Sequence, residues 1–144
     1  MIMGRHTIKT WSTTQSVTAL SSGEAEYYGI VKGGSQGIGL RSMMGELGVE
    51  VDLRVMTDAS AALGISTRRG LGKVRHIEVS KLWIQEKVSD GTMRILSTKT
   101  DSNKADVLTK HVDSMRLKYH IESAGAVLRP GRHPLAPSVI GGYN

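Results

Sequence analysis

A long helical pattern over residues 22–47 is the feature that most constrains how this chain can fold. It opens with S-S-G-E at residues 21–24, a capping box in which a Ser hydroxyl and a Glu carboxylate satisfy backbone donors at a helix start. An apolar stripe at i, i+3, i+4 and i+7 ends at Leu47, and Gly48 follows as a terminator. We therefore expect one helix from near Ser22 to about Leu47.

The middle of this predicted helix holds five glycines: Gly29, Gly33, Gly34, Gly37 and Gly39. Each glycine costs about 1 kcal/mol relative to Ala in a helix interior. The helix must therefore be held by tertiary packing, or else it breaks near Gly34. Close approach of another backbone would explain glycines at these positions.

The rest of the chain alternates strand and helix patterns. Strands are expected at residues 6–12, 51–57 and 92–98. Helices are expected at residues 59–66 and 77–88, from a cap at Asp101 or Ser102 to Val112, and at residues 114–122. This alternation predicts an α/β fold in which helices flank a sheet.

Composition indicates one small domain of an intracellular protein. The 144 residues are 39% hydrophobic, without a run of the ~18 apolar residues that a membrane helix needs. Arg5 and His6 stand where a signal peptide would have its apolar stretch, and the absence of Cys excludes a disulfide scaffold. We expect the domain to cover residues 1–122. Residues 123–144 hold all three prolines, four glycines and no acid, which is typical of a flexible tail.

The charge of the chain favours a polyanionic partner such as nucleic acid. Lys and Arg number 19 against 13 Asp and Glu, which gives a net charge of +6. Residues 67–76 form a loop with two glycines and no acid, and its cations are Arg68, Arg69, Lys73 and Arg75. The alternative interpretation is a solvated charged surface with no partner.

Three acidic residues stand where a polar side chain can converge on one edge of an α/β sheet. They are Glu26 early in the long helix, Asp58 at the end of a strand, and Asp106 at the start of a late helix. Taken singly, each is better explained by a structural role: the helix dipole for Glu26, capping for Asp58 and solvation for Asp106. Together they would hold Mg²⁺, and two such ions can promote phosphodiester hydrolysis.

Four ordered motifs resemble one known family. They are T-A-L-S-S-G-E-A-E-Y-Y (residues 18–28), T-D-A-S-A-A (57–62), K-V-R-H-I-E-V (73–79) and N-K-A-D-V-L-T-K (103–110). In order and spacing, over residues 8–112, they resemble the ribonuclease H domain of copia-type retrotransposon Pol polyproteins. The resemblance implies a mixed five-stranded sheet with helices on both faces. It also implies metal-dependent hydrolysis of RNA paired with DNA.

The resemblance also assigns roles to residues. Glu26, Asp58 and Asp106 match the family's catalytic carboxylates and would bind Mg²⁺, with Mn²⁺ as a substitute, whereas Glu24 belongs to the helix cap. An RNA/DNA hybrid is the expected partner. Its backbone and 2′-hydroxyls would meet small residues at the helix starts and the basic loop. The residues expected to bind nucleic acid are Ser22, Gly23, Ser60, Arg68, Arg69, Lys73 and Arg75.

One element of the family is not found in this sequence. The family's first strand carries an Asp that reaches both metal ions, but no acid precedes Glu24 here. We therefore expect a ribonuclease H-like sheet that lacks its first strand, and an activity that is impaired unless a reverse transcriptase or an upstream polypeptide supplies the strand. The alternatives are a non-catalytic nucleic-acid-binding remnant, a poorly folded fragment, or a nuclease of the integrase and resolvase branches.

Overall fold

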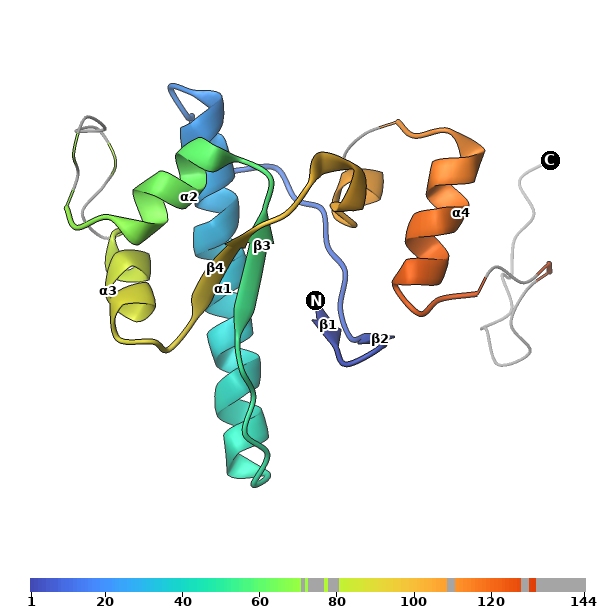
Figure 1. The fold of residues 1–144 in the computed structure, drawn as a ribbon, viewed down its shortest axis with the longest axis horizontal. Helices are drawn as coiled ribbons and strands as arrows, with labels where there is room; N and C mark the ends of the chain where they lie inside the picture. The colour runs from blue at the N-terminus through green and yellow to red at the C-terminus, as the bar shows by residue number, and fades with distance from the viewer. Residues whose placement is uncertain (71, 73–76, 78–80, 109–110, 128–129, 132–144) are drawn as a thin grey trace, which may run out of the picture.

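The computed structural model describes residues 1–70, 72, 77, 81–108, 111–127 and 130–131. Within these ranges the protein is a mixed α/β structure with four α-helices and two small sheets (Figure 1). Strands β3 (Arg54–Thr57) and β4 (Arg94–Ser97) pair in parallel, and β1 (Ile2–Met3) and β2 (His6–Thr7) pair antiparallel. The predicted α/β class is therefore confirmed.

Helix α1 (Ser22–Glu46) begins at the predicted capping box. The Ser21 hydroxyl accepts a hydrogen bond from the Glu24 backbone N–H at 3.2 Å. The buried Glu24 carboxylate accepts from the Leu20 backbone N–H and from the Tyr28 hydroxyl, both at 2.8 Å. These bonds fix the chain where it enters the helix, and they confirm that Glu24 belongs to the cap.

Helix α1 runs unbroken through the five glycines of its middle part. A Cβ at Gly34 would lie 2.9 Å from Cδ1 of Ile84, and a Cβ at Gly37 would lie 2.6 Å from Cδ1 of Leu53. These two glycines let core side chains approach the helix closely, so the close neighbours are side chains and not the backbone that the sequence suggested. A Cβ would meet nothing within 4 Å at Gly29, Gly33 and Gly39.

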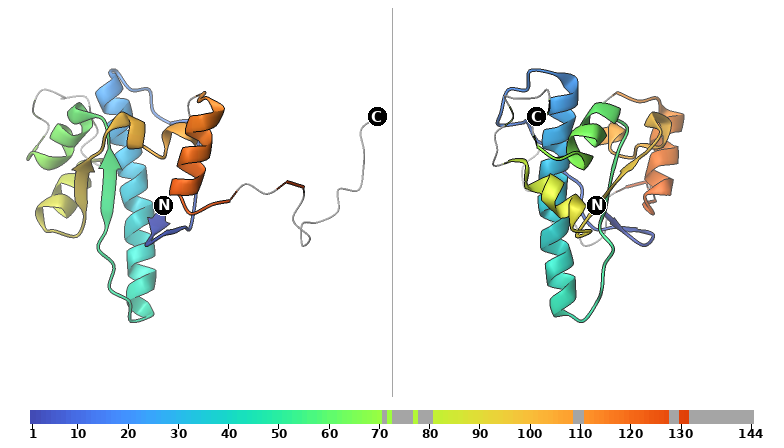
Figure 2. Two further views of the ribbon diagram at one scale, coloured as in Figure 1. Left: turned by 45° about the vertical axis from the view of Figure 1, so that its right-hand side comes forward. Right: turned by 60° about the vertical axis from the view of Figure 1, so that its left-hand side comes forward.

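The parallel pair is connected through α2 (Ser60–Thr67) and α3 (Trp83–Ser89). Its register aligns Arg54 with Arg94 and ends with Thr57 opposite Ser97. Helices α1 and α2 contact β3, and α2 also contacts β4 (Figures 1 and 2). The buried apolar core comprises Tyr27, Ile30, Ala62, Ile65, Ile77, Ile84, Met93 and Ile95. Strands β3 and β4 lie within the predicted ranges and α2 extends one residue beyond its range, whereas α3 begins six residues later than predicted, and residues 78–80 lie outside the described ranges.

The α-helix predicted between Asp101 and Val112 is wrong for the residues that the structure describes there. The chain forms two short 3₁₀ turns instead, η2 (Thr100–Ser102) and η3 (Asp106–Leu108). Asn103 separates them in an extended conformation, and its side-chain oxygen accepts from the Ala105 backbone N–H at 3.2 Å. This local side-chain bond competes with helix formation.

The N-terminal segment also differs from the prediction of one mixed sheet. The strand expected at residues 6–12 is only two residues long, and in the described structure β1 and β2 form a sheet separate from β3 and β4. Side chains hold the following segment to α1. Lys9 Nζ donates to Gln36 at 2.8 Å, and Gln15 donates to the Ala25 carbonyl at 2.7 Å. These contacts replace the strand ladder.

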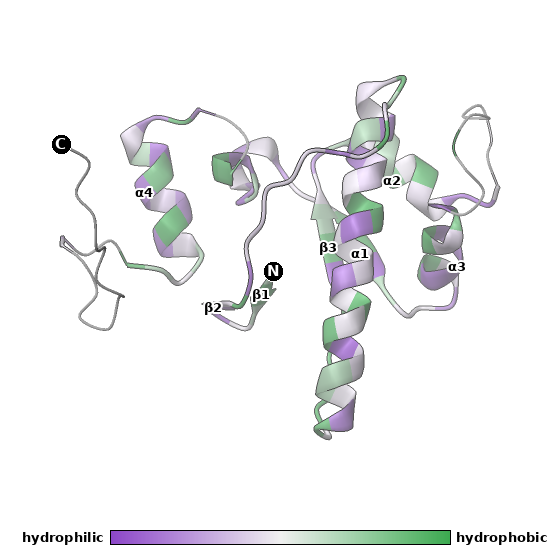
Figure 3. Cartoon of the chain, turned by 180° about the vertical axis from the view of Figure 1, so that it is seen from behind, coloured by the Kyte–Doolittle hydropathy of each residue, from purple (hydrophilic) through white to green (hydrophobic). Residues whose placement is uncertain are grey.

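Helix α4 (Ser114–Ser123) forms where the last helix was predicted, and the Asp113 side chain caps it by accepting from the Arg116 N–H at 2.9 Å. It stands beside the β1–β2 hairpin and apart from the β3–β4 pair, with hydrophobic and hydrophilic residues alternating along it (Figures 1 and 3). The Thr7 hydroxyl donates to the Ala124 carbonyl at 2.7 Å, which joins hairpin and helix. Most of the predicted tail lies outside the described residues. No described helix has the length and apolar character needed to cross a bilayer.

We predict that valine is tolerated at Gly39 of α1 but not at Gly34. Gly34→Val should lower the free energy of unfolding by about 1–3 kcal/mol, because its methyl groups would collide with Ile84 and Met93. Gly39→Val, with the same change in helix propensity but open space around it, should change that energy by no more than about 0.5 kcal/mol. Urea unfolding followed by circular dichroism measures both. Equal unfolding midpoints would show that α1 does not pack as described.

Candidate functional site

Two of the predicted carboxylates meet at the carboxyl edge of the parallel pair. Asp58 directly follows β3, and Asp106 opens the turn η3 beyond β4. Asn103 lies between them. Its side-chain nitrogen donates to Asp58 Oδ1 at 3.4 Å and to Asp106 Oδ1 at 3.2 Å. One amide group therefore joins two half-buried carboxylates that are 48 residues apart in the sequence.

The local sequence explains how these side chains come together. The strand ladder continues past the pair, because the Thr98 N–H donates to the Thr57 carbonyl at 2.9 Å. The buried Thr57 hydroxyl accepts from the Ala59 N–H at 3.1 Å, which turns the chain out of β3 at Asp58. On the other side, the Asp106 N–H donates to the Asn103 carbonyl at 3.2 Å. Both carboxylates are thus attached to short turns at one sheet edge.

Glu26, the third predicted carboxylate, does not join this pair in a metal-binding group. Its side chain is exposed on the second turn of α1. Across the described residues, no three Asp, Glu or His side chains lie close enough together to hold a metal ion. Mg²⁺ can bind through one or two carboxylates with waters and substrate phosphates. The described side chains therefore offer a partial site and do not fit a complete two-ion centre.

The first two cations of the predicted basic loop, Arg68 and Arg69, differ in their exposure to solvent. Arg68 is half-buried, and a Cβ at Gly72 would lie 2.7 Å from its guanidinium. Its charge also acts on Tyr27: burial raises the pKa of Tyr27 to about 12, and the nearby Arg68 cation opposes that rise. Arg69, in contrast, is exposed. Lys73 and Arg75 lie outside the described residues.

The three small residues predicted to meet nucleic acid lie where α1 and α2 begin. A Cβ at Gly23 would lie 2.7 Å from Cβ of Ala61, so the two helix starts are in contact. Ser22 and Ser60 are exposed at these starts. The N-cap residue of α2 is Ala59, whose side chain makes no capping hydrogen bond. First-turn N–H groups of a helix favour anions, so this junction suits contact with a phosphate.

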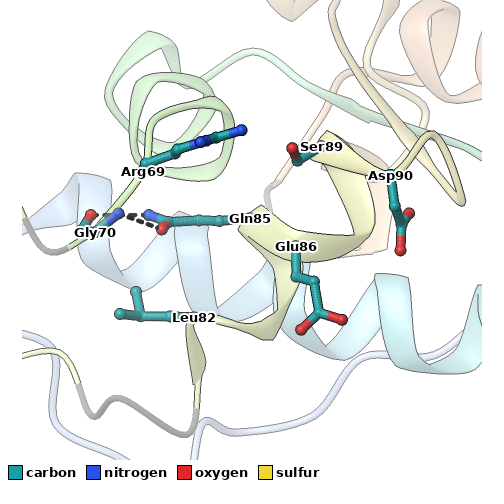
Figure 4. A pocket seen from close by; sticks show the side chains of 7 residues that line it. All are labelled: Arg69, Gly70, Leu82, Gln85, Glu86, Ser89 and Asp90. Atoms are coloured by element: carbon teal, nitrogen blue, oxygen red, sulfur yellow. Dashed lines mark hydrogen bonds between the residues drawn. The ribbon is translucent and has the colours of Figure 1, made fainter.

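A pocket of about 430 Å³ lies beside Arg69, between the loop after α2 and helix α3 (Figure 4). It is lined by Arg69, Gly70, Leu82, Gln85, Glu86, Ser89 and Asp90. Lys87 Nζ lies 3.5 Å from Glu86 Oε1 and 3.2 Å from Asp90 Oδ2, so the two acids of the pocket have a cation beside them. The pocket has charges of both signs, which does not indicate an anion site in its interior.

Sequence reasoning did not single out two residues that hold these surfaces together. Asn103 is only the first letter of a motif in the sequence, although Asn side chains commonly bond to the backbone two residues on, as Asn103 does to the Ala105 N–H. Gln85 bonds to the start of the basic loop but looks, in the sequence, like any polar residue of a helix. Its long-range partners leave no local signal.

Comparison with known proteins gives one informative similarity. The chain is 33% identical over 116 residues to the retrovirus-related Pol polyprotein from transposon TNT 1-94 of Nicotiana tabacum. The matched region covers 79% of this chain but only 9% of that polyprotein. No family model matches the chain, and no solved structure matches it. The similarity over most of the chain supports an origin in a retrotransposon Pol polyprotein.

Proposed function

We propose that this chain is a ribonuclease H-type domain that hydrolyses the RNA strand of RNA/DNA hybrids, with impaired activity as it stands. The observation that carries the proposal is the carboxylate pair Asp58 and Asp106, joined through Asn103 at the carboxyl edge of β3 and β4. Open α/β sheets bind ligands at this edge. The Pol similarity and the four ordered motifs support the same function.

The carboxylates account for both the activity and its impairment. Asp58 and Asp106 would hold a divalent cation, Mg²⁺ or Mn²⁺, which supplies charge stabilisation at the phosphodiester when bound. Glu26 would have to approach from α1 to act as a further ligand. A carboxylate from outside these 144 residues, supplied by an upstream polypeptide or a reverse transcriptase, would complete the set. This chain alone is therefore expected to react slowly.

Phosphate contacts would hold the hybrid near the carboxylates. Arg69 is exposed after α2, and Ser22, Gly23 and Ser60 lie at the junction of the two helix starts. Such contacts position a duplex without reading its sequence, and they weaken as salt rises. Lys73 and Arg75, which the sequence also predicts to bind nucleic acid, lie outside the described residues.

A second candidate function is non-catalytic binding of nucleic acid. One observation favours it: the three predicted carboxylates do not form one metal-binding group in the described structure. In this case the phosphate-binding surface would act without hydrolysis. Divalent cations would then be unnecessary.

We predict slow cleavage of a labelled RNA/DNA hybrid in Mn²⁺, and slower cleavage in Mg²⁺. Asp58→Asn should reduce the rate at least about 100-fold. Removal of a residue that only supports a metal ligand costs up to about 100-fold, and removal of the ligand itself should cost at least as much. Asp52→Asn is the matched control, because Asp52 lies at the opposite end of the same sheet, paired with Arg54 and Arg94. It should leave the rate unchanged. Salt-dependent binding without cleavage, unaffected by Asp58→Asn, would contradict the nuclease and select the binding function.

A second prediction concerns the amide that joins the carboxylates. Asn103→Asp places a third acid beside Asp58 and Asp106, and repulsion should lower the melting temperature at pH 7 by about 4 °C, equivalent to ~1 kcal/mol. Millimolar Mn²⁺ should restore it, because a cation that binds the folded state stabilises that state. Asn103→Ala removes the same donor without adding a carboxylate, so Mn²⁺ has only Asp58 and Asp106 to bind and should raise the melting temperature of this variant by less. Equal responses of the two variants in scanning calorimetry would show that the three positions do not converge.

A further inference from the structure

Gln85 of α3 makes three hydrogen bonds to the backbone at the end of α2. Its side-chain nitrogen donates to the Ile65 carbonyl at 2.8 Å and to the Gly70 carbonyl at 3.0 Å. Its side-chain oxygen accepts from the Gly70 N–H at 2.8 Å. Figure 4 shows the two bonds between Gln85 and Gly70. The Gln85 side chain therefore acts as both donor and acceptor toward Gly70, which lies 15 residues away in the sequence, and as a donor toward Ile65 in α2.

These bonds satisfy groups that the end of α2 exposes. The last carbonyls of a helix have no partner within it, and α2 has no basic residue in its last turn. Gln85 supplies a donor to one of these carbonyls from outside the helix. Gly70, at φ +77°, takes the left-handed conformation that turns the chain away, and Gln85 binds both of its backbone groups.

Arg69 lies between the two backbone positions that Gln85 holds. Its neighbour Arg68 is half-buried near Tyr27, whereas the Arg69 side chain is exposed. The backbone of Arg69 is thus fixed on both sides while its guanidinium remains accessible. Fixing a loop before binding removes part of the entropy cost of ordering it in the complex.

We propose that Gln85 is a positioning residue that holds Arg69 ready to contact a phosphate of the nucleic-acid backbone. The inference rests on the proposed function, because it assumes that the chain binds an RNA/DNA hybrid. Gln85 does not touch the nucleic acid itself. The phosphate meets Arg69 on its solvent side, since Glu86 and Asp90 line the pocket on the other side.

Fluorescence anisotropy with a labelled RNA/DNA hybrid, over a series of salt concentrations, tests this role. Gln85→Leu should weaken binding about 2–10-fold, the loss expected when one long side chain is no longer pre-ordered. Arg69→Ala should weaken binding and reduce the salt slope by about 1. In the Arg69→Ala background, Gln85→Leu should have no further effect. Additive losses would overturn the proposal, because they would mean that Gln85 acts independently of Arg69.

Gln36→Leu is the matched control, since Gln36 is an exposed glutamine of α1 whose side-chain oxygen accepts a hydrogen bond from Lys9 Nζ at 2.8 Å. It should bind the hybrid like the unmodified chain. If Gln85→Leu does not fold, Gln85→Glu replaces it. Glutamate keeps the size and the acceptor for Gly70 N–H but cannot donate to the Ile65 and Gly70 carbonyls, so the same coupling to Arg69 is expected.

Hydrogen exchange of the Gly70 amide separates this proposal from the function on which it rests. The amide should be protected in the unmodified chain and should exchange faster in Gln85→Leu. Unchanged exchange would overturn the role of Gln85 even if the hybrid binds. Absence of hybrid binding by the unmodified chain, with the amide protected, would overturn the proposed function and the phosphate contact of Arg69 together.

Discussion

The parallel pairing of β3 with β4 is the constraint on which the rest of the structure depends. Parallel strands need a crossover connection, and here α2 and α3 provide it. Because both strands run the same way, the residues that follow them emerge at one edge. Asp58 and Asp106 reach each other for this reason, and Asn103 is placed to bond with both.

A pair of strands this short is not stable by itself and depends on helix packing. Helix α1 supplies it, because Gly34 and Gly37 let Ile84, Met93 and Leu53 approach the helix closely. The packing is one-sided: Met56 and Leu96, which face each other across the pair, are exposed. The carboxylate edge therefore rests on a core built against a single face of the sheet.

The parts of the fold governed by local sequence could be predicted. The capping box placed the start of α1, and Gly48 placed its end. The α-helix expected around Asp106 was wrong because the Asn103 side chain bonds to the nearby Ala105 N–H, to the nearby Asp106 carboxylate and to the distant Asp58 carboxylate. Helix propensity identifies Asn as a weak helix former, but it gives no information on the partner Asp58 at the end of β3.

In the candidate site, too, some features follow from the local sequence and others depend on long-range contacts. The acids at Asp58 and Asp106 follow from motifs and from the way strands end, and the structure joins them. Which cations face solvent depends on tertiary contacts, so the inward position of Arg68 and the exposed position of Arg69 could not be foreseen. Glu26 matches its motif, yet in the described structure it forms no metal-binding group with the other two acids.

The proposed function depends on divalent-cation binding by the carboxylates at one edge of the β3–β4 pair. Paramagnetic line broadening in ¹⁵N NMR spectra during a Mn²⁺ titration tests it most directly. We predict that the Asn103 side-chain amide and the backbone amides of Asp58 and Asp106 broaden first, while the backbone amide of Asp52 at the opposite end of the sheet stays sharp. Broadening centred on Asp52, or none at Asp58 and Asp106 at millimolar Mn²⁺, would contradict it.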